Sequence, residues 1–246
     1  MEENLKNCET DGLLPILTKY LPKDGKILEA GCGLGKWVVF LKSKGFDISG
    51  VDSYPDVIKA AKKYDKNLPV SVDNVAKLSL KSNSLDAYLS FGVVEHFEDG
   101  PQKPLSEAFR VLKKGGVAVI ETPYDNLFRI MGRLIVRIKT PLRILIEELG
   151  LRSKRVILEQ YFYEYHYTKQ ELIDHVKKAG FTILESFPKD DLSPNRSIGL
   201  WLDFPRLRQK DAGEFVLTPF GRLVKRLFSP FPEFWSACTV VVAQKR

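Results

Sequence analysis

The chain has 246 residues, a length typical of one large domain or of one domain that carries insertions. Of its residues, 44% are hydrophobic and 28% are charged, a composition typical of globular proteins. This composition excludes collagen-like, disordered and multi-spanning membrane proteins. Lys and Arg number 38 against 31 Asp and Glu, so the net charge is +7. This surplus indicates an anionic partner, such as nucleic acid, a membrane surface or an acidic substrate.

The cysteines and the N-terminal residues indicate the cell compartment. Cys8, Cys32 and Cys238 are widely spaced and form neither a disulfide framework nor a zinc pattern, so a reducing setting is expected. The first residues are acidic and resemble no secretory signal, and no apolar run reaches the ~18 residues of a membrane-spanning helix. The sequence therefore predicts a cytoplasmic protein that does not cross a bilayer.

Short β-branched runs alternate with helical patterns from residue 26 to residue 122, which is typical of βα units and a parallel sheet. Five strands are expected, over Lys26–Ala30, Asp47–Asp52, Pro69–Asp73, Leu85–Phe91 and Gly116–Thr122. Three helices are expected between them, over Gly35–Lys44, Pro55–Tyr64 and Pro104–Leu112.

The last part of the chain predicts two more strands. Thr168 and Glu171 form a capping box that begins a helix to about Ala179. Strands are expected over Phe181–Phe187 and Ala237–Ala243. The whole chain, 1–246, is therefore predicted to be one α/β domain with a Rossmann-like, seven-stranded, mostly parallel sheet sandwiched by helices.

Two stretches fall outside the alternation and are predicted to be helical insertions, one after the fifth strand and one between the sixth and seventh. These cap segments, 126–155 and 204–228, combine apolar residues at helical spacing with basic residues on another face. They carry net charges of +6 and +4, so the remaining chain carries −3. The basic character belongs to the insertions.

The most specific motif is the run Glu29-Ala30-Gly31-Cys32-Gly33-Leu34-Gly35, where the first strand turns into the first helix. A dinucleotide fingerprint needs glycine at the position of Lys36, and a P-loop needs a G-K-[ST] ending; both are absent. An acidic residue before the glycine loop instead suits a ligand with a positive centre.

The E-x-G-x-G-x-G pattern resembles the class I S-adenosylmethionine-dependent methyltransferases, in particular the quinone-biosynthesis-like type 11 group, and the likeness spans 26–122 and 165–187. The resemblance implies S-adenosyl-L-methionine as the cofactor. It implies these binding residues: Glu29, Gly31, Cys32, Gly33, Asp52, Ser53, Asp73, Asn74, Val75 and Phe91. Asp52 falls at the position where an acidic residue of such folds accepts hydrogen bonds from the ribose hydroxyls. Either Asp73 or Asn74 is expected to reach the adenine.

Candidate catalytic residues are His96, His166 and Glu95. His96 follows the fourth strand and is either a general base or a histidine that holds backbone at a helix start. His166 either joins the acceptor pocket or anchors the loop. Gly92 replaces the first acid of the E-x-x-E-H metal site that this segment resembles, so no metal is expected.

These features predict methyl transfer to an O or N atom of a small, hydrophobic or lipid-linked acceptor. The basic amphipathic insertions also favour peripheral binding to an anionic membrane, at its inner face. A nucleic-acid methyltransferase is an alternative, which the absence of an N-P-P-Y motif after the fourth strand disfavours. A non-catalytic cofactor-binding or membrane-docking module is a second alternative, and a nicotinamide-dependent reductase a remote third. The sequence indicates neither oligomeric state nor pathway.

Overall fold

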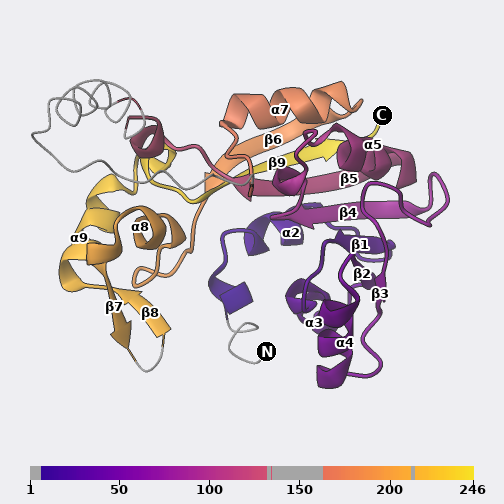
Figure 1. Cartoon of the computed structure of the whole chain (residues 1–246), viewed down its shortest axis with the longest axis horizontal. Coiled ribbons are helices and arrows are strands. Elements are labelled where there is room, and N and C mark those ends of the chain that lie inside the picture. The colour runs from indigo at the N-terminus through magenta and orange to yellow at the C-terminus, as the bar shows by residue number, and fades with distance from the viewer. Residues whose placement is uncertain (1–6, 132–133, 135–162, 212–213) are drawn as a thin grey trace, which may run out of the picture.

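The computed structural model describes residues 7–131, 134, 163–211 and 214–246. Its centre is a seven-stranded sheet in the order β3-β2-β1-β4-β5-β9-β6 (Figure 1). The strands are β1 (Ile27–Ala30), β2 (Ile48–Asp52), β3 (Val70–Val72), β4 (Leu85–Phe91), β5 (Leu112–Pro123), β6 (Thr182–Lys189) and β9 (Cys238–Gln244). All seven predicted strands are therefore confirmed, and the Rossmann-like fold class with them.

Strand direction follows the predicted mostly parallel arrangement with one exception. β3, β2, β1, β4 and β5 pair in parallel, whereas β9 is antiparallel to both β5 and β6. Leu85–Phe91 has the predicted bounds, while β5 begins at Leu112, four residues earlier than expected. The buried, β-branched strands made the sheet predictable, because strands covered on both faces have nearly continuous apolar sequences.

Helices cover both faces of the sheet (Figure 1). α2 (Leu14–Tyr20), α3 (Lys36–Ser43) and α4 (Pro55–Tyr64) pack on one face, and α5 (Gln102–Val111) and α7 (Lys169–Lys178) on the other. The side chains of successive strand residues point to opposite faces of the sheet. Leu89 packs with α2, α3 and α4, and the neighbouring Tyr88 packs with α5 and α7. α2 was not predicted.

The predicted capping box at the start of α7 is confirmed. The Glu171 amide donates to Thr168 Oγ1 at 3.3 Å, and the Thr168 amide donates to Glu171 Oε2 at 2.8 Å. The two hydrogen bonds pair amides that have no partner within the helix, so α7 can begin directly after the extended chain that precedes Thr168. That extended chain carries residues of the site described below.

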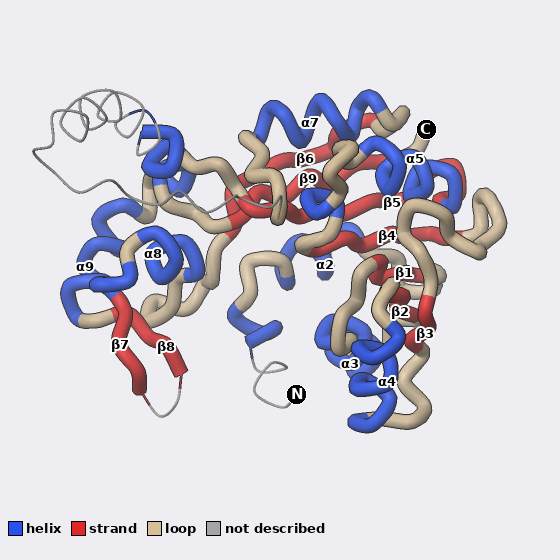
Figure 2. Tube along the Cα trace, in the orientation of Figure 1, coloured by secondary structure: helices blue, strands red, loops and turns tan. Residues whose placement is uncertain are grey.

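Beside the sheet, residues 198–234 build a small lobe that we call the cap (Figure 2). It consists of α8 (Ile198–Asp203), a 3-10 turn η2 (Pro205–Leu207), a hairpin of β7 (Arg208–Asp211) and β8 (Glu214–Leu217), α9 (Pro219–Phe228) and η3 (Pro232–Phe234). The insertion predicted over 204–228 thus contains a hairpin as well as a helix. Of the insertion predicted over 126–155, only 126–131 and 134 lie within the described residues.

Lys225 corrects one detail of the amphipathic pattern in α9. The sequence pattern groups it with the basic residues of the helix, but its side chain points inward and its Nζ donates to the backbone oxygens of Asp191 and Ser193 at 2.7 and 2.6 Å. It also donates to the Arg196 oxygen. Three carbonyl acceptors make Lys225 a structural tie between α9 and the chain that enters the cap. Across the parts of the chain that the structure describes, no helix combines the length and apolarity that crossing a bilayer requires.

Candidate active site

The carboxyl ends of β1 to β4 open into one cavity of about 560 Å³. Ligands of open α/β sheets bind at this edge, where successive loops diverge. The described residues that line the cavity are Gly31, Asp52, Ser53, Tyr54, Val75, Gly92, Val93, His96, Phe97 and Tyr163. Four predicted cofactor residues, Gly31, Asp52, Ser53 and Val75, are therefore brought together here.

The glycine loop after β1 needs glycine at two positions for different reasons. Gly31 has φ +77°, and a Cβ there would lie 2.3 Å from Val93 Cγ2, so no side chain fits. Gly33 has φ +53° with open space where a Cβ would be. Its amide donates to Asp52 Oδ2 at 2.9 Å, which fixes the loop to the end of β2.

Asp52 is held in place by backbone amides. Besides the bond from Gly33, its Oδ1 accepts from the Tyr54 amide at 3.0 Å. A carboxylate has about four acceptor positions, so two amides leave capacity for the hydroxyls of a ligand. The exposed Tyr54 ring stands next to it on the cavity wall.

Asp73 and Asn74, the two candidates for the adenine contact, both accept hydrogen bonds from backbone amides of their own loop. Asp73 accepts from the amides of Asn74 and Ser79 at 2.8 and 2.9 Å, and Asn74 Oδ1 accepts from the Ala76 amide at 2.9 Å. Neither is among the residues that line the cavity, whereas Val75 is. These hydrogen bonds stabilise the loop that places Val75 in the cavity wall.

Three further predicted cofactor residues, Glu29, Cys32 and Phe91, are not among the described residues that line the cavity. Glu29 is buried, and its Oε2 has no hydrogen-bond partner among the described residues. Burial raises its pKa to about 8, while Lys36 and the Val38 amide act to lower it. Cys32 packs against Gly50, and the Phe91 ring packs against Trp37 at 6.0 Å. A buried carboxyl group with one unpartnered oxygen next to the glycine loop fits a ligand with a positive centre.

The predicted base, His96, lies in the cavity wall at the end of the 3-10 turn η1 (Val94–His96). Its Nδ1 lies 3.0 Å from the Tyr163 oxygen, and the two rings meet edge to face at 5.5 Å. Its Nε2 is 3.9 Å from Glu164 Oε2. Tyr163 and Glu164 therefore complete the surroundings of His96, and sequence reasoning missed both.

The other two candidates join the same cluster. Glu95 is 1% exposed, and burial raises its pKa to about 8; its Oε2 has no hydrogen-bond partner among the described residues. His166 does not line the cavity, but its Nε2 lies 2.8 Å from Glu164 Oε1 and its Nδ1 lies 3.5 Å from Arg129 Nη1. Glu164 thus stands between the two histidines. Glu164 and His166 are two apart on an extended stretch, a spacing that puts both on one face and that could have indicated the pair.

The cluster also has the composition of a metal site. One ligand atom from each of Glu95, His96 and Glu164 lies within 4.8 Å of the others. Gly92 has no side chain to offer, and the second carboxylate of the cluster comes from Glu164. Two carboxylates and one imidazole could hold a divalent cation. The expectation of no metal, which rested on Gly92, stays a prediction.

Comparison with known proteins agrees with this geometry. A family profile described as "Methyltransferase domain" matches residues 28–120. A ubiquinone/menaquinone biosynthesis C-methyltransferase UbiE from Campylobacter jejuni is 29% identical over 183 residues, which cover 69% of this chain and 76% of that protein.

Solved structures share the fold at lower identity. A SAM-dependent methyltransferase from Methanosarcina mazei superposes with a TM-score of 0.59 at 20% identity, over 94% of this chain and 97% of the other. One from Archaeoglobus fulgidus gives 0.61 at 17% identity, over 99% and 94%. The sheet order, the glycine loop, the cavity and the matched domain lead to one conclusion: the chain is a class I S-adenosylmethionine-dependent methyltransferase, and S-adenosyl-L-methionine is its cofactor.

Proposed function

We propose that the enzyme methylates an O or N atom of a small, hydrophobic or lipid-linked acceptor, with His96 as the general base. The observation that carries the proposal is the position of His96 in the wall of the cofactor cavity. S-adenosylmethionine supplies an electrophilic methyl group when bound. The task left to the protein is to align the acceptor and to take the proton that a hydroxyl or amine loses.

The contact with Tyr163 determines which nitrogen of His96 can act. A backbone oxygen only accepts hydrogen bonds, so Nδ1 of the neutral ring carries the hydrogen. Nε2 is then the unprotonated nitrogen that can accept a proton from the acceptor. The carbonyl of Tyr163 thereby fixes both the tautomer and the ring orientation.

Glu164 is placed to stabilise the histidine once it is protonated. Its Oε2 is 3.9 Å from His96 Nε2, close enough for a favourable interaction with the imidazolium charge. His166 contacts the other oxygen of the Glu164 carboxylate and holds it in position, and Arg129 in turn contacts His166. In this arrangement His96 is the base and Glu164 is a positioning residue.

The surface of α9 supports the proposal that the acceptor is lipid-linked and that the enzyme binds it at an anionic membrane. Phe220, Leu223 and Leu227 are 64, 50 and 63% exposed, although large apolar residues are usually buried. The exposed Arg222 and Arg226 lie on the same helix. An exposed apolar face with flanking arginines is typical of helices that lie in a membrane interface.

An acceptor screen tests the proposal. We expect S-adenosylhomocysteine to form with extracted lipids or quinones, faster in anionic than in neutral vesicles, and not with soluble metabolites or RNA. Carbon acceptors with an ionisable hydroxyl belong in the screen, because the UbiE relatives are named C-methyltransferases. Turnover with RNA alone, or with soluble metabolites alone, would contradict the proposed acceptor class.

The raised pKa of Glu29 predicts that cofactor binding releases a proton. With a pKa of about 8 the carboxyl is mostly protonated at pH 7, and a cation bound near it favours the ionised form. Affinity for S-adenosylmethionine should therefore rise with pH, by at most about tenfold per unit, and level off above pH 8. Calorimetry in two buffers with different ionisation enthalpies measures the released proton.

Two substitutions show whether the proton is released by Glu29 or by Glu95, another carboxyl group with a raised pKa. Glu29→Gln should abolish the buffer dependence of the binding heat, whereas Glu95→Gln should retain it. Equal binding heats in both buffers for the unmodified enzyme would show that Glu29 does not respond to the cofactor charge.

A further inference from the structure

A second cavity, which we call the cap pocket, lies inside the cap and belongs to no part of the cofactor site. Its volume is about 540 Å³, within the range of small-molecule sites. Eight of its nine lining side chains among the described residues are apolar or aromatic, and Arg206 is the ninth. The walls are well packed: the Phe128 ring meets the rings of Phe204 and Phe228 edge to face at 5.4 and 6.1 Å.

The mouth of the cap pocket has the two properties that an amphiphile needs. Phe220 and Phe228, which line it, are also exposed on α9, so the apolar lining continues onto the surface. Arg206 lines the pocket and is itself exposed. An apolar interior with a cation at the rim is complementary to an apolar chain that ends in an anionic group.

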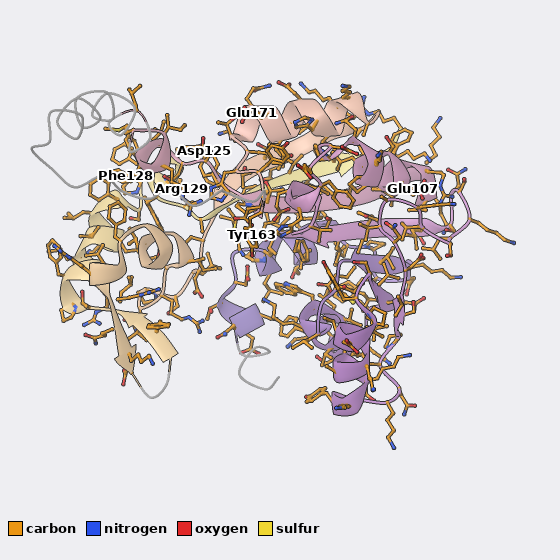
Figure 3. The ribbon with its side chains drawn as sticks, in the orientation of Figure 1. Glu107, Asp125, Phe128, Arg129, Tyr163 and Glu171 are labelled. Carbon is orange, nitrogen blue, oxygen red and sulfur yellow. The ribbon has the colours of Figure 1, made fainter. Side chains whose placement is uncertain are left out.

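The cap pocket adjoins the proposed catalytic cluster through neighbouring residues. Phe128 forms part of the pocket, and the next residue, Arg129, lies 3.5 Å from His166. His166 in turn contacts Glu164, which faces His96. In Figure 3, Arg129 is drawn between Phe128 and Tyr163. A series of side-chain contacts therefore connects Phe128 in the wall of the cap pocket to His96 in the wall of the cofactor cavity.

We propose that the cap pocket binds the apolar chain of the methyl acceptor, and that Arg206 pairs with an anionic group, such as a phosphate, at the head of that chain. The inference rests on the proposed function and sharpens it, because it assigns the acceptor to anionic long-chain amphiphiles. It also gives the cap a purpose beyond membrane contact, because the bound apolar chain is taken out of water.

Binding of simple alkyl phosphates tests the assignment without requiring turnover. Octyl, decyl and dodecyl phosphate, below their micelle concentrations, should bind with affinities that rise by about fourfold per added methylene. Brominated dodecyl phosphate should quench Trp235, the pocket tryptophan, in an enzyme whose other tryptophans are replaced (Trp37→Phe, Trp201→Phe). If these probes bind and no acceptor is methylated in the screen, the proposed reaction fails while the pocket assignment stands.

Two neighbouring residues of α9 supply a matched pair of variants. Val224 lines the cap pocket, and Leu223 is exposed outside it. Val224→Asp should weaken dodecyl phosphate binding at least tenfold, and Leu223→Asp should leave it unchanged. Arg206→Gln should weaken dodecyl phosphate but not dodecanol. If Val224→Asp does not fold, the Trp235 quenching in the unmodified pocket decides the question.

Three results would overturn the proposal. The first is an affinity that does not depend on chain length, and the second is the absence of Trp235 quenching. The third is self-association of the enzyme that Val224→Asp abolishes and that dodecyl phosphate does not affect, because the pocket would then bind a second copy of the chain.

Discussion

Asp52→Ala should weaken S-adenosylmethionine binding by about 10- to 100-fold, because a hydrogen bond to a charged group contributes roughly 1.5–3 kcal/mol. The substitution removes the carboxylate that lines the cavity and frees the amides of Gly33 and Tyr54, which it now holds. Both the acceptor for ribose hydroxyls and the position of the glycine loop are lost together. Calorimetry with S-adenosylmethionine and S-adenosylhomocysteine measures the effect.

Asp56→Ala is the control for this substitution. Asp56 is exposed in the first turn of α4 and does not line the cavity, so its replacement makes the same change in net charge four residues after Asp52. Its cofactor affinity should match that of the unmodified enzyme. If Asp52→Ala and Asp56→Ala bind the cofactor equally well, Asp52 is a structural residue of the loop and no ligand of the cofactor.

The sheet and the glycine loop were predictable because their signals are local. The helix Pro55–Tyr64 and the strand Leu85–Phe91 occur at their predicted bounds, as each has a period and a start signal of its own. The hairpin of β7 and β8 was missed, because four-residue strands such as Arg208–Asp211 are too short and too polar to show alternation.

The surroundings of the base were less predictable, since they depend on contacts between distant parts of the chain. Tyr163 and Glu164 reach His96 from 67 and 68 positions away, and no local pattern marks that approach. The same limit applies to Lys225, whose place in the amphipathic pattern did not reveal that it turns inward to three carbonyls. Periodicity assigns a residue to a helix face but does not say what covers that face.

The substitution His96→Ala should reduce turnover by about 10²- to 10⁴-fold, the usual contribution of a general base, and leave cofactor affinity nearly unchanged. The imidazole is held by the Tyr163 oxygen with Nε2 available, and it lies in the wall of the cavity apart from the glycine loop and Asp52, which are expected to bind the cofactor. Rates of S-adenosylhomocysteine formation with the acceptor from the screen, together with calorimetry for the cofactor, separate the two effects. Glu164→Gln should reduce turnover less, because it removes charge stabilisation but leaves the base.

His175→Gln provides the matched histidine control, because His175 lies in α7 beside Gln102 and does not line the cavity. Its turnover should equal that of the unmodified enzyme. An unchanged rate in His96→Ala would remove His96 from the mechanism. Loss of turnover on treatment with a chelator, restored by Mn²⁺, would instead assign Glu95, His96 and Glu164 to a metal ion, because a proton-accepting histidine requires none.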